Sequence, residues 1–496
     1  MKPLLKSKLP RNLVESMGSF GYSLPASVAD IIDNSISADC SNIWIKFLWN
    51  NGSPWLAIID DGRGMNRTEL EDALCFAGKS SSEKRSKSDL GRFSLGLKTA
   101  SISQCKHLTV AVKSKEDSLS IGEWNLEEEG EDPDYISSSI LETEDLDADC
   151  FLNSFLKQEF ETIPSGCLVL WRSLDLSIVG DGRSADERRF SEKMNLVHLH
   201  LERTFHRFLN PERGFSTKNM YFNNTQITGF DPFGPSNNPA RVELPSQKIR
   251  LQGEEIKIQP YILPHRSKVS EPEYKKYAGE EGYLQNQGFY IYRNRRLIQH
   301  STWFRLIKKE ELNKLIRVRV DIPNSLDELW KIDVRKSLAQ PPESVRNQFK
   351  TVINRIEGAG KMVFKKRAAK ISSKNIVSIW SREIIEGKIQ YKVNEEFPLL
   401  KDIIEKSEKD FSKKIKMCLD QINHCFPYDL YFSDAADDTT DFVDTETNED
   451  QIRSTIEKLV EIFAAQGFTR DQIRRKIEET DIHGINSKLI KEVVNN

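Results

Sequence analysis

At 496 residues the chain is too long for one hydrophobic core, and we expect two to four domains. Hydrophobic residues make up 38% and charged residues 30% of the sequence, no apolar run can cross a bilayer, and no signal peptide is evident, so we expect neither a membrane nor a secreted protein. Seven scattered cysteines fit reduced thiols and a cytoplasmic location, and a net charge of -3 leaves a nucleic-acid partner open.

The first 230 residues have the pattern of a mixed α/β unit. Apolar residues recur at helical spacing in some segments and alternate in others, with turn-forming residues between them. In chain order, the sequence predicts a helix at 24–38, strands at 42–49 and 54–60, a helix at 66–77, a Ser- and Lys-rich loop at 78–90, a helix from near Leu95, β-rich sequence at 107–125, an acidic loop at 126–148, a buried strand at 167–174 and a long helix at 186–209.

The rest of the chain divides into a second α/β unit, from about 240 to 340, and a charged part that is mainly helical. The composition becomes rich in Lys, Glu and Ile in this last part, which favours helices. In order, the sequence predicts strands at 257–263, 288–298 and 316–322, helices from Pro342, a basic segment at 361–375, an acidic flexible linker at 434–450, and two or three short helices at 451–493 with a break at 467–469.

The predicted helix at 24–38 carries a small polar face. At about 100° per residue its apolar residues and Ser35 fall on one side, whereas Asp30 and Asn34 lie one turn apart on the other. A carboxylate there can orient or deprotonate a water molecule. An amide oxygen can bind Mg²⁺, which usually takes only one or two ligands from protein. Alone, such a pair is more typical of a solvated helix face.

Two glycine-containing turns follow, with the sequences IIDDGRGM and LGRFSLGLKTAS. In the first, a strand delivers Asp60 and then Gly62 and Gly64, which allow positive φ and the close approach of a ligand. In the second, Gly91 and Gly96 flank the start of a helix whose N–H groups can hold phosphates. Each turn alone is a weak signal, because β-turns use the same residues.

Gly78, Lys79 and Ser80 look like part of a P-loop, but the surrounding sequence excludes one. Ala73 stands where a P-loop has its first glycine, and a helix is predicted before it where a strand is required. The segment 78–90 fits better as a mobile lid that a nucleotide orders.

In this order, ADIIDNSISA, IIDDGRGM and LGRFSLGLKTAS resemble the nucleotide pocket of GHKL ATPases, which have the Bergerat fold. The likeness is to the branch of MutL, heat-shock chaperones and microrchidia (MORC) proteins, and above all to bacterial MORC-like ATP-binding proteins. It implies an α/β sandwich ATPase domain, a transducer-like α/β domain of the ribosomal S5-like type and a helical C-terminal region. The implied domains are the ATPase domain at 10–235, the transducer-like domain at 236–345, a helical region at 346–432, an acidic linker at 433–450 and a small helical module at 451–496.

The resemblance implies roles for individual residues. Asp30 takes the position of the family's general-base glutamate and is one methylene shorter, so we expect slow hydrolysis. Asn34 takes the position of the Mg²⁺ ligand and Asp60 that of the acceptor for the adenine amino group, with Asp61 only an intervening residue. The remaining positions implied to bind nucleotide are Gly62, Gly64, Met65, Lys79, Gly91, Arg92, Phe93, Ser94, Leu95, Gly96, Lys98 and Cys167.

Two departures from the family pattern and a distant lysine complete the implied site. Ser94 replaces a glycine of the phosphate turn, and Cys167 replaces a threonine of the adenine-site strand. In the transducer-like domain, Lys336 matches the lysine that reaches the γ-phosphate, with Lys331 as second choice and a simple surface lysine as the alternative. The cluster from Arg293 to Arg296 suits phosphate, DNA or a solvated hairpin, of which we favour the hairpin.

The resemblance implies a cytoplasmic ATPase that binds ATP with Mg²⁺, forms a homodimeric clamp on ATP binding and reopens after hydrolysis. Its work would concern DNA, such as defence against foreign DNA together with a companion nuclease or helicase, and the basic segment 361–375 is compatible with this. Two alternatives stay open. One is a heat-shock-type chaperone, and the other is a nucleotide-gated scaffold with negligible turnover, for which Asp30, Ser94 and Cys167 give the motive.

Overall fold

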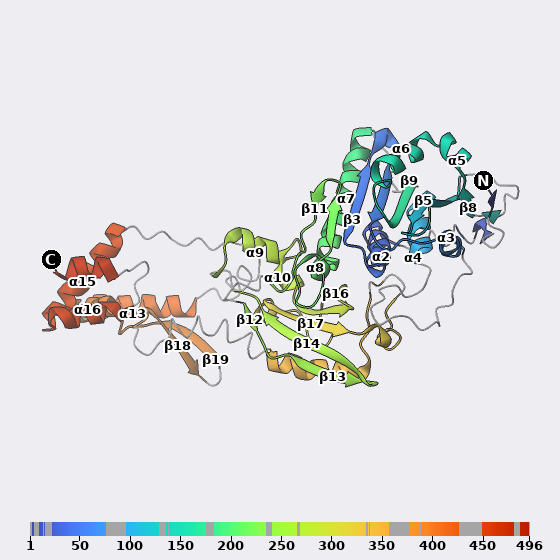
Figure 1. Cartoon of the computed structure of the whole chain (residues 1–496). Helices are drawn as coiled ribbons and strands as arrows, with labels where there is room; N and C mark the ends of the chain where they lie inside the picture. Colours follow the sequence, from blue (N-terminus) through green and yellow to red (C-terminus); the bar gives the residue numbers. More distant parts are fainter. Residues whose placement is uncertain are drawn as a thin grey trace. The chain divides into compact units, whose positions relative to one another are not determined.

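The computed structural model forms two compact units, divided in the sequence after Ile356. The first unit contains two β-sheets with their helices, and the second contains a hairpin and five helices among its described residues (Figure 1). The structure describes residues 2–3, 9–12, 14, 22–75, 96–127, 135–136, 138–174, 183–234, 241–264, 268–333, 336, 338–356, 377–385, 388–425, 449–480 and 487–495.

A nine-stranded sheet is the centre of the first subdomain, which covers the described residues up to 234. Neighbouring strands are antiparallel, except that the third-last and second-last strands run parallel. From edge to edge the strands are β1 (Lys2–Pro3), β8 (Ser138–Leu141), β6 (Ser120–Asn125), β5 (Cys105–Lys113), β9 (Gly166–Leu174), β4 (Trp55–Asp60), β3 (Asn42–Leu48), β10 (Asn219–Phe222) and β11 (Thr225–Gln226). A separate short pair joins β2 (Leu9–Pro10) to β7 (Tyr135–Ile136).

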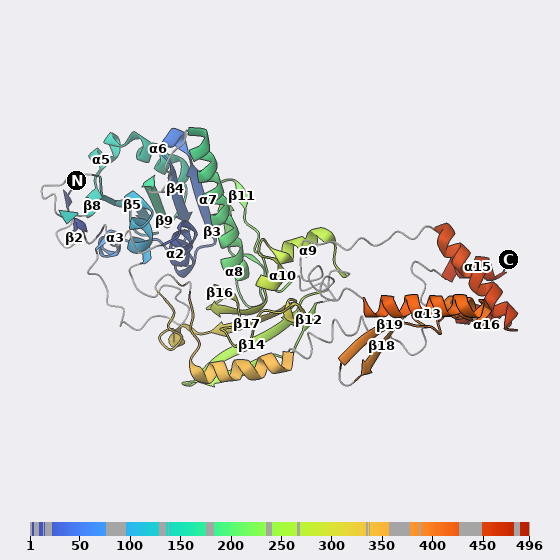
Figure 2. The ribbon, with the colours of Figure 1, turned by 180° about the vertical axis from the view of Figure 1, so that it is seen from behind.

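Helices cover both faces of this sheet, because its central strands are apolar on both sides. In β4, Leu56 and Ile58 enter one core, whereas Ala57 and Ile59 enter the other. The first core is covered by α2 (Leu24–Ser37), α3 (Arg67–Leu74), α4 (Gly96–Ile102), α7 (Arg183–Thr204) and α8 (His206–Leu209), and the second by α5 (Thr143–Ala148) and α6 (Cys150–Glu159). Figure 2 shows α2 and α7 beside the sheet from behind.

Helix α2 starts where the sequence predicts and ends one residue earlier. The Ser23 hydroxyl accepts a hydrogen bond from the Ala26 N–H at 3.4 Å, and Pro25 lies in the first turn, where its missing N–H costs nothing. Val28, Ile31 and Ile32 are buried in the first core, as their helical spacing indicates. This packing fixes the direction in which the polar residues of α2 point.

One predicted loop is wrong in its described part. The acidic segment 126–148 contains β7, β8 and α5. Its acidic residues make a helix start, because Asp145 accepts a hydrogen bond from the Glu142 N–H at 2.9 Å and Glu142 caps the same turn in return. Ile136 and Ile140 are buried, which holds the two short strands. The segment 78–90 lies outside the described residues.

The second subdomain, which covers 241–356, is built on a six-stranded sheet with the order β12, β14, β17, β15, β16, and with β13 also on β14. Strands β15 and β17 run parallel and the other pairs are antiparallel. The bounds are β12 (Val242–Glu243), β13 (Gln247–Leu251), β14 (Glu254–Ile262), α9 (Glu271–Ala278), α10 (Gly282–Gln285), β15 (Gly288–Arg293), β16 (Arg296–Thr302) and β17 (Ile316–Ile322), with 3-10 turns at Glu311–Asn313 and Asn324–Leu326. The three predicted strand segments are confirmed.

The helix predicted from Pro342 exists, but it belongs to the core of the second subdomain. Residues 343–356 are helical. Five apolar residues of this helix pack into the same core as β14, β15 and β17: Val345, Phe349, Val352, Ile353 and Ile356. The predicted domain boundary at 345 therefore falls inside this helix, which packs on strands that precede it in the sequence.

The second unit is helical, as predicted, except for one hairpin. Strands β18 (Trp380–Ile385) and β19 (Lys388–Val393) pair within the region 346–432, which we predicted to be a helical region. In β19, Ile389, Tyr391 and Val393 alternate with polar residues, a strand pattern that the prediction missed. The helices are α12 (Pro398–Lys406), α13 (Lys409–His424), α15 (Glu449–Ala465), α16 (Arg470–Glu478) and α17 (Ser487–Asn495), and the last three confirm the prediction for 451–493.

The break predicted at 467–469 is confirmed, since Gly467 has a φ of +83° between α15 and α16. The linker at 433–450 lies almost entirely outside the described residues. All seven cysteines are free, as predicted. Within the described ranges, no helix is both long enough and apolar enough to cross a membrane.

Candidate functional site

Helix α2 presents three polar residues in different directions. Asp30 is only 2% exposed and Asp33 is fully buried, whereas Asn34 is exposed. The sequence predicts a shared open face for Asp30 and Asn34, and the structure separates them. Asp30 points toward the second subdomain because a pair of cations from that subdomain meets it.

Those cations are Lys336 and Arg296, and they form a buried cluster with Asp30 and Asp33. Lys336 Nζ lies 3.2 Å from Asp30 Oδ1 and 2.5 Å from Asp33 Oδ2. Arg296 Nε lies 2.8 Å from Asp33 Oδ2, and its Nη2 lies 3.5 Å from Asp30 Oδ1. Two carboxylates and two cations therefore balance one another between α2 and the second subdomain.

Of the two predicted lysines, Lys336 is the one that contacts Asp30. It is 7% exposed, which contradicts the alternative of a surface lysine, whereas Lys331 is exposed. The solvated hairpin that we favoured for 293–296 is also wrong. Arg293 and Arg296 are each 2% exposed, and Arg293 donates from Nε to Asp327 Oδ1 at 2.8 Å.

Burial dominates the electrostatics of Asp30. It raises the pKa of Asp30, and the charges of Lys336 and Arg296 oppose that shift, while the charge of Asp33 adds to it. Tyr22 donates a hydrogen bond from its hydroxyl to Asp30 Oδ2 at 3.3 Å. A carboxylate with a raised pKa is a stronger base than an ordinary aspartate, and this one is also held in place.

Asp60 ends β4 on the sheet face that α2 covers. It is 4% exposed, and its two oxygens accept hydrogen bonds from the Ser35 hydroxyl at 2.7 Å and the Gly62 N–H at 2.9 Å. Burial raises the pKa of Asp60, and these hydrogen bonds oppose the shift. Asp61 instead accepts from the backbone N–H groups of Ser41 and Asn42, which fits its expected role as an intervening residue.

The glycines of the first turn are needed for close packing of the chain. A Cβ at Gly64, which has a φ of +69°, would lie 1.9 Å from the Lys113 carbonyl oxygen. A Cβ at Gly62 would lie 2.8 Å from the Ala38 Cβ. Gly96 begins α4, and a Cβ there would meet nothing within 4 Å, so backbone packing does not explain that glycine. Met65 packs against the first core.

Lys98 of α4 contacts the end of α3. It is 3% exposed and donates from Nζ to the Cys75 carbonyl oxygen after the end of α3, and burial lowers its pKa. This hydrogen bond supports the packing of α4 against α3, and the predicted contact with a phosphate stays a prediction. The predicted positions Lys79, Gly91, Arg92, Phe93, Ser94 and Leu95 lie outside the described residues.

Cys167 lies beside Asp60 across the β4–β9 pair. Both residues are on the face of the sheet that α2 covers, and Cys167 packs against the first core. Burial, together with the charge of Asp60, raises the pKa of the Cys167 thiol well above its usual value. The thiol is therefore neutral at physiological pH, and it can offer only weak hydrogen bonds where the family has a hydroxyl.

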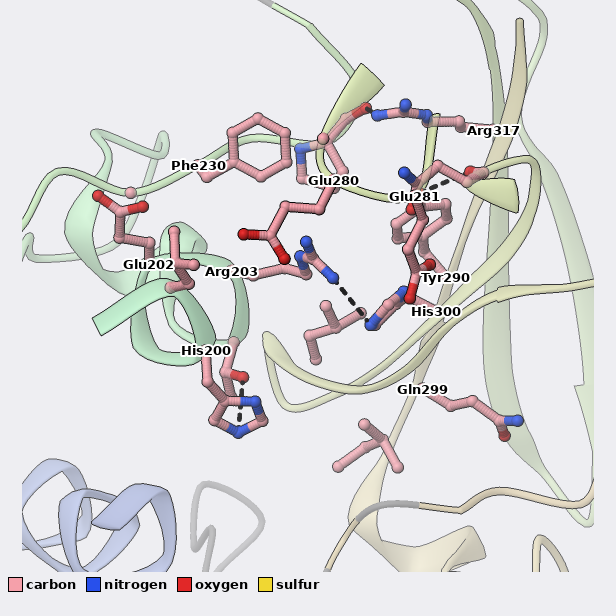
Figure 3. Close-up of a pocket in the computed structure, with 18 of the residues that line it drawn as sticks. His200, Glu202, Arg203, Phe230, Glu280, Glu281, Tyr290, Gln299, His300 and Arg317 are labelled. Atoms are coloured by element: carbon pink, nitrogen blue, oxygen red, sulfur yellow. Dashed lines mark hydrogen bonds between the residues drawn. The ribbon is translucent and has the colours of Figure 1, made fainter. Parts of the chain in front are cut away.

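A cavity of about 580 Å³ lies between α7 and the second subdomain. Arg296 and Lys336 are part of its lining. Figure 3 shows Arg203 of α7 pointing at His300 of β16, with Arg203 Nη1 and His300 Nε2 3.2 Å apart. Burial and neighbouring charges lower the pKa of His300 to about 3 and that of His200 to about 4. The cavity therefore reaches the back of the buried cluster.

Sequence reasoning missed Asp33, Arg296, Ser35 and Tyr22. Asp33 and Arg296 are 263 residues apart, so no local spacing connects them. We expected Ser35 on the packing face of α2, which is correct. On that face its hydroxyl also donates a hydrogen bond to Asp60 of β4. A useful signal was available, because IIDN contains a second carboxylate that had no assigned partner.

Comparison with known proteins identifies a related family for part of the first subdomain. Residues 22–162 match the family described as histidine kinase-, DNA gyrase B-, and HSP90-like ATPase. A segment of 112 residues is 28% identical to ATPase morc-1 of Caenorhabditis elegans, and it covers 23% of this chain and 13% of that protein. The chain thus matches about an eighth of the length of this curated relative. Helix α2, β4 and the Asp60 turn lie within the segment that matches this family of GHKL ATPases, and the chain has a weak likeness to a MORC ATPase.

Proposed function

We propose that this protein binds ATP with Mg²⁺ in its GHKL domain and hydrolyses it slowly, with Asp30 as general base and Lys336 as the cation that meets the γ-phosphate. The observation that carries the proposal is the contact between Asp30 and Lys336, which are 306 residues apart. A carboxylate and an ammonium brought together from two subdomains suit a reaction that has to be coupled to movement.

Asn34 is the candidate ligand for Mg²⁺. Its side chain is exposed, and no described residue makes a hydrogen bond to its amide group. A single amide oxygen fits Mg²⁺, which prefers oxygen ligands and usually takes the rest from phosphates and water. When bound, the ion would supply positive charge to the phosphates of the nucleotide.

The chemistry proposed for Asp30 needs a change of partners. Lys336 is held by two carboxylates, so its ammonium has to exchange carboxylate oxygens for phosphate oxygens before it can stabilise transferred charge. That exchange would leave Asp30 with one cation fewer. Asp30 is also one methylene shorter than the usual glutamate, and a base displaced by about 1 Å can lose about a hundredfold in rate.

The dimeric clamp and the work on DNA are further parts of the proposal. Support comes from the family, whose GHKL and MORC members typically dimerise. Further support comes from the second subdomain, which contacts Asp30, the proposed general base. The basic segment 361–375 lies outside the described residues, so DNA binding rests on its composition alone. A companion nuclease or helicase is the partner that we propose for defence against foreign DNA.

A second candidate is a nucleotide-gated scaffold with negligible turnover. One observation favours it, since Asp30 is paired with both Lys336 and Arg296. A carboxylate held by two cations accepts a proton less readily than one held by none. The two candidates differ only in the rate of phosphate release.

Asp60→Asn should change the base that the pocket prefers. Asp60 already accepts from Ser35 and Gly62, and an amide in its place would present a donor to the amino group of adenine. We expect ATP affinity to fall by about 10- to 100-fold, the effect of one unsatisfied buried polar group. Inosine triphosphate, which has a carbonyl oxygen at that position, should then bind better than ATP in a titration calorimetry experiment. Equal losses for both nucleotides would contradict the role of Asp60.

Asp30→Ala should remove hydrolysis and keep binding. Without the Asp30 carboxylate the proposed general base is gone, and we expect the single-turnover rate to fall by at least about a hundredfold. ATP affinity, measured separately by calorimetry, is the control and should stay close to that of the wild type. An unchanged single-turnover rate would exclude Asp30 as the base.

The oligomeric state should depend on the nucleotide. Light scattering without nucleotide, with ADP and with a non-hydrolysable ATP analogue should detect a dimer only with the analogue, because only a third phosphate engages Lys336. A dimer in all three conditions, or in none, would contradict the clamp. Dimerisation with ATP but without phosphate release would favour the scaffold.

DNA binding should be electrostatic and therefore weaken with salt. If the basic segment contacts phosphates, the logarithm of the affinity should fall linearly with the logarithm of the salt concentration. Fluorescence anisotropy with duplex DNA, with and without the ATP analogue, measures this slope. Absence of binding at low salt in both states would remove DNA from the proposal.

A further inference from the structure

Arg296 touches three parts of the candidate site with one side chain. Its Nε lies 2.9 Å from Asp33 Oδ1, its Nη2 lies 3.5 Å from Asp30 Oδ1, and its Nη1 donates to the Lys336 carbonyl oxygen at 3.2 Å. The first two groups belong to α2 and the third to the loop of the second subdomain. The planar guanidinium can hold all three in one geometry, which a lysine cannot do.

The hairpin between β15 and β16 delivers Arg296 to this position. Asn294 and Arg295 both have positive φ, at +46° and +72°, which is the tight turn that matches the twist of a two-stranded ribbon. Arg296 follows directly and is 2% exposed. Its place is therefore set by the backbone of a regular element and does not depend on a surface loop.

The loop that carries Lys336 depends on this contact. Lys336 has a φ of +50°, a left-handed conformation that residues other than glycine adopt only when their surroundings hold them there. The Arg296 guanidinium binds the carbonyl oxygen of this same residue. Arg296 thus holds both the lysine's backbone and the carboxylates that the lysine's side chain contacts.

Asp33 has the matching role on α2. It is fully buried, and Arg296 and Lys336 are its partners in the cluster. If Lys336 leaves for a phosphate, Asp33 keeps Arg296, so the cluster does not acquire an unpaired buried carboxylate. The cavity of about 580 Å³ is lined by both cations, which gives the lysine side chain space to move.

We propose that Arg296, paired with Asp33, is a positioning residue of the ATPase reaction, which holds Asp30 and the Lys336 loop in alignment across the contact between the ATPase domain and the second subdomain. This inference rests on the proposed function. Arg296 touches no nucleotide in this proposal and acts through Asp30 and Lys336. Its loss should therefore reduce turnover much more than ATP affinity.

The test compares Arg296→Gln and Arg296→Lys with a matched control, Arg293→Gln. Arg293 is equally buried and is paired with Asp327 within the second subdomain, so its loss removes a similar ion pair that includes neither Asp30 nor Asp33. For each full-length variant we would measure kcat at saturating ATP, the Kd for ATP by calorimetry and the melting temperature. Rates are expressed per folded molecule.

We expect Arg296→Gln to lower kcat by about 10- to 100-fold, the cost of a misaligned catalytic group, with a Kd for ATP within about threefold of the wild type. The kcat of Arg296→Lys should lie between that of Arg296→Gln and that of the wild type, because lysine keeps the positive charge but lacks the planar guanidinium. Arg293→Gln should melt at a lower temperature and keep its kcat. The double variant Arg296→Gln with Asp33→Asn should lose no more activity than the worse single variant, because coupled residues are not additive.

Equal effects of Arg296→Gln and Arg293→Gln on kcat would overturn the inference, as would losses that multiply in the double variant. If Arg296→Gln does not fold, the kcat of Arg296→Lys against that of Arg293→Lys decides. Failure of the proposed function has a different signature, since the wild type itself would then bind no ATP or release no phosphate.

Discussion

Four charges buried between two subdomains set the conditions for the rest of this structure. Removing a carboxylate or an ammonium from water costs several kcal/mol, and attraction in the interior offsets that cost only when every charge is paired. Asp30, Asp33, Arg296 and Lys336 meet this condition only while the two subdomains are in contact. Separating the subdomains would therefore break all of these ion pairs at once.

Helix α2 connects this cluster with the adenine end of the candidate pocket. The apolar residues of α2 fix it on the sheet, and the helical period then sends Asp33 to the second subdomain, Ser35 to Asp60 and Asn34 to solvent. Asp33 and Ser35 are two residues apart, so one turn of α2 holds both the contact to Asp60 and the contact to the second subdomain. Helix α2 thus carries the contact to Asp60, the proposed metal ligand Asn34 and the contact to the second subdomain.

Local physics made most of the elements predictable. Periodicity and caps located α2, β4, β9, β17 and the helices after 449, and the fold class is confirmed. The contacts that the sequence did not predict are non-local. Arg296 and Asp33 are joined only by the packing of two subdomains. A polar helix face has the same sequence pattern whether it meets water or buried cations. The contact of Lys98 with the Cys75 carbonyl oxygen is likewise non-local, because that carbonyl lies at the end of a different helix.

The two histidines beside the cavity have a consequence for acid stability. His200 and His300 are neutral in the folded protein, with pKa values of about 4 and about 3, whereas an unfolded histidine titrates near 6.5. The unfolded chain therefore binds more protons, and the free energy of unfolding decreases as the pH falls below about 6.5. Above that pH both side chains are neutral in the folded and the unfolded chain, so their contribution to stability no longer changes with pH and is lost only on acidification.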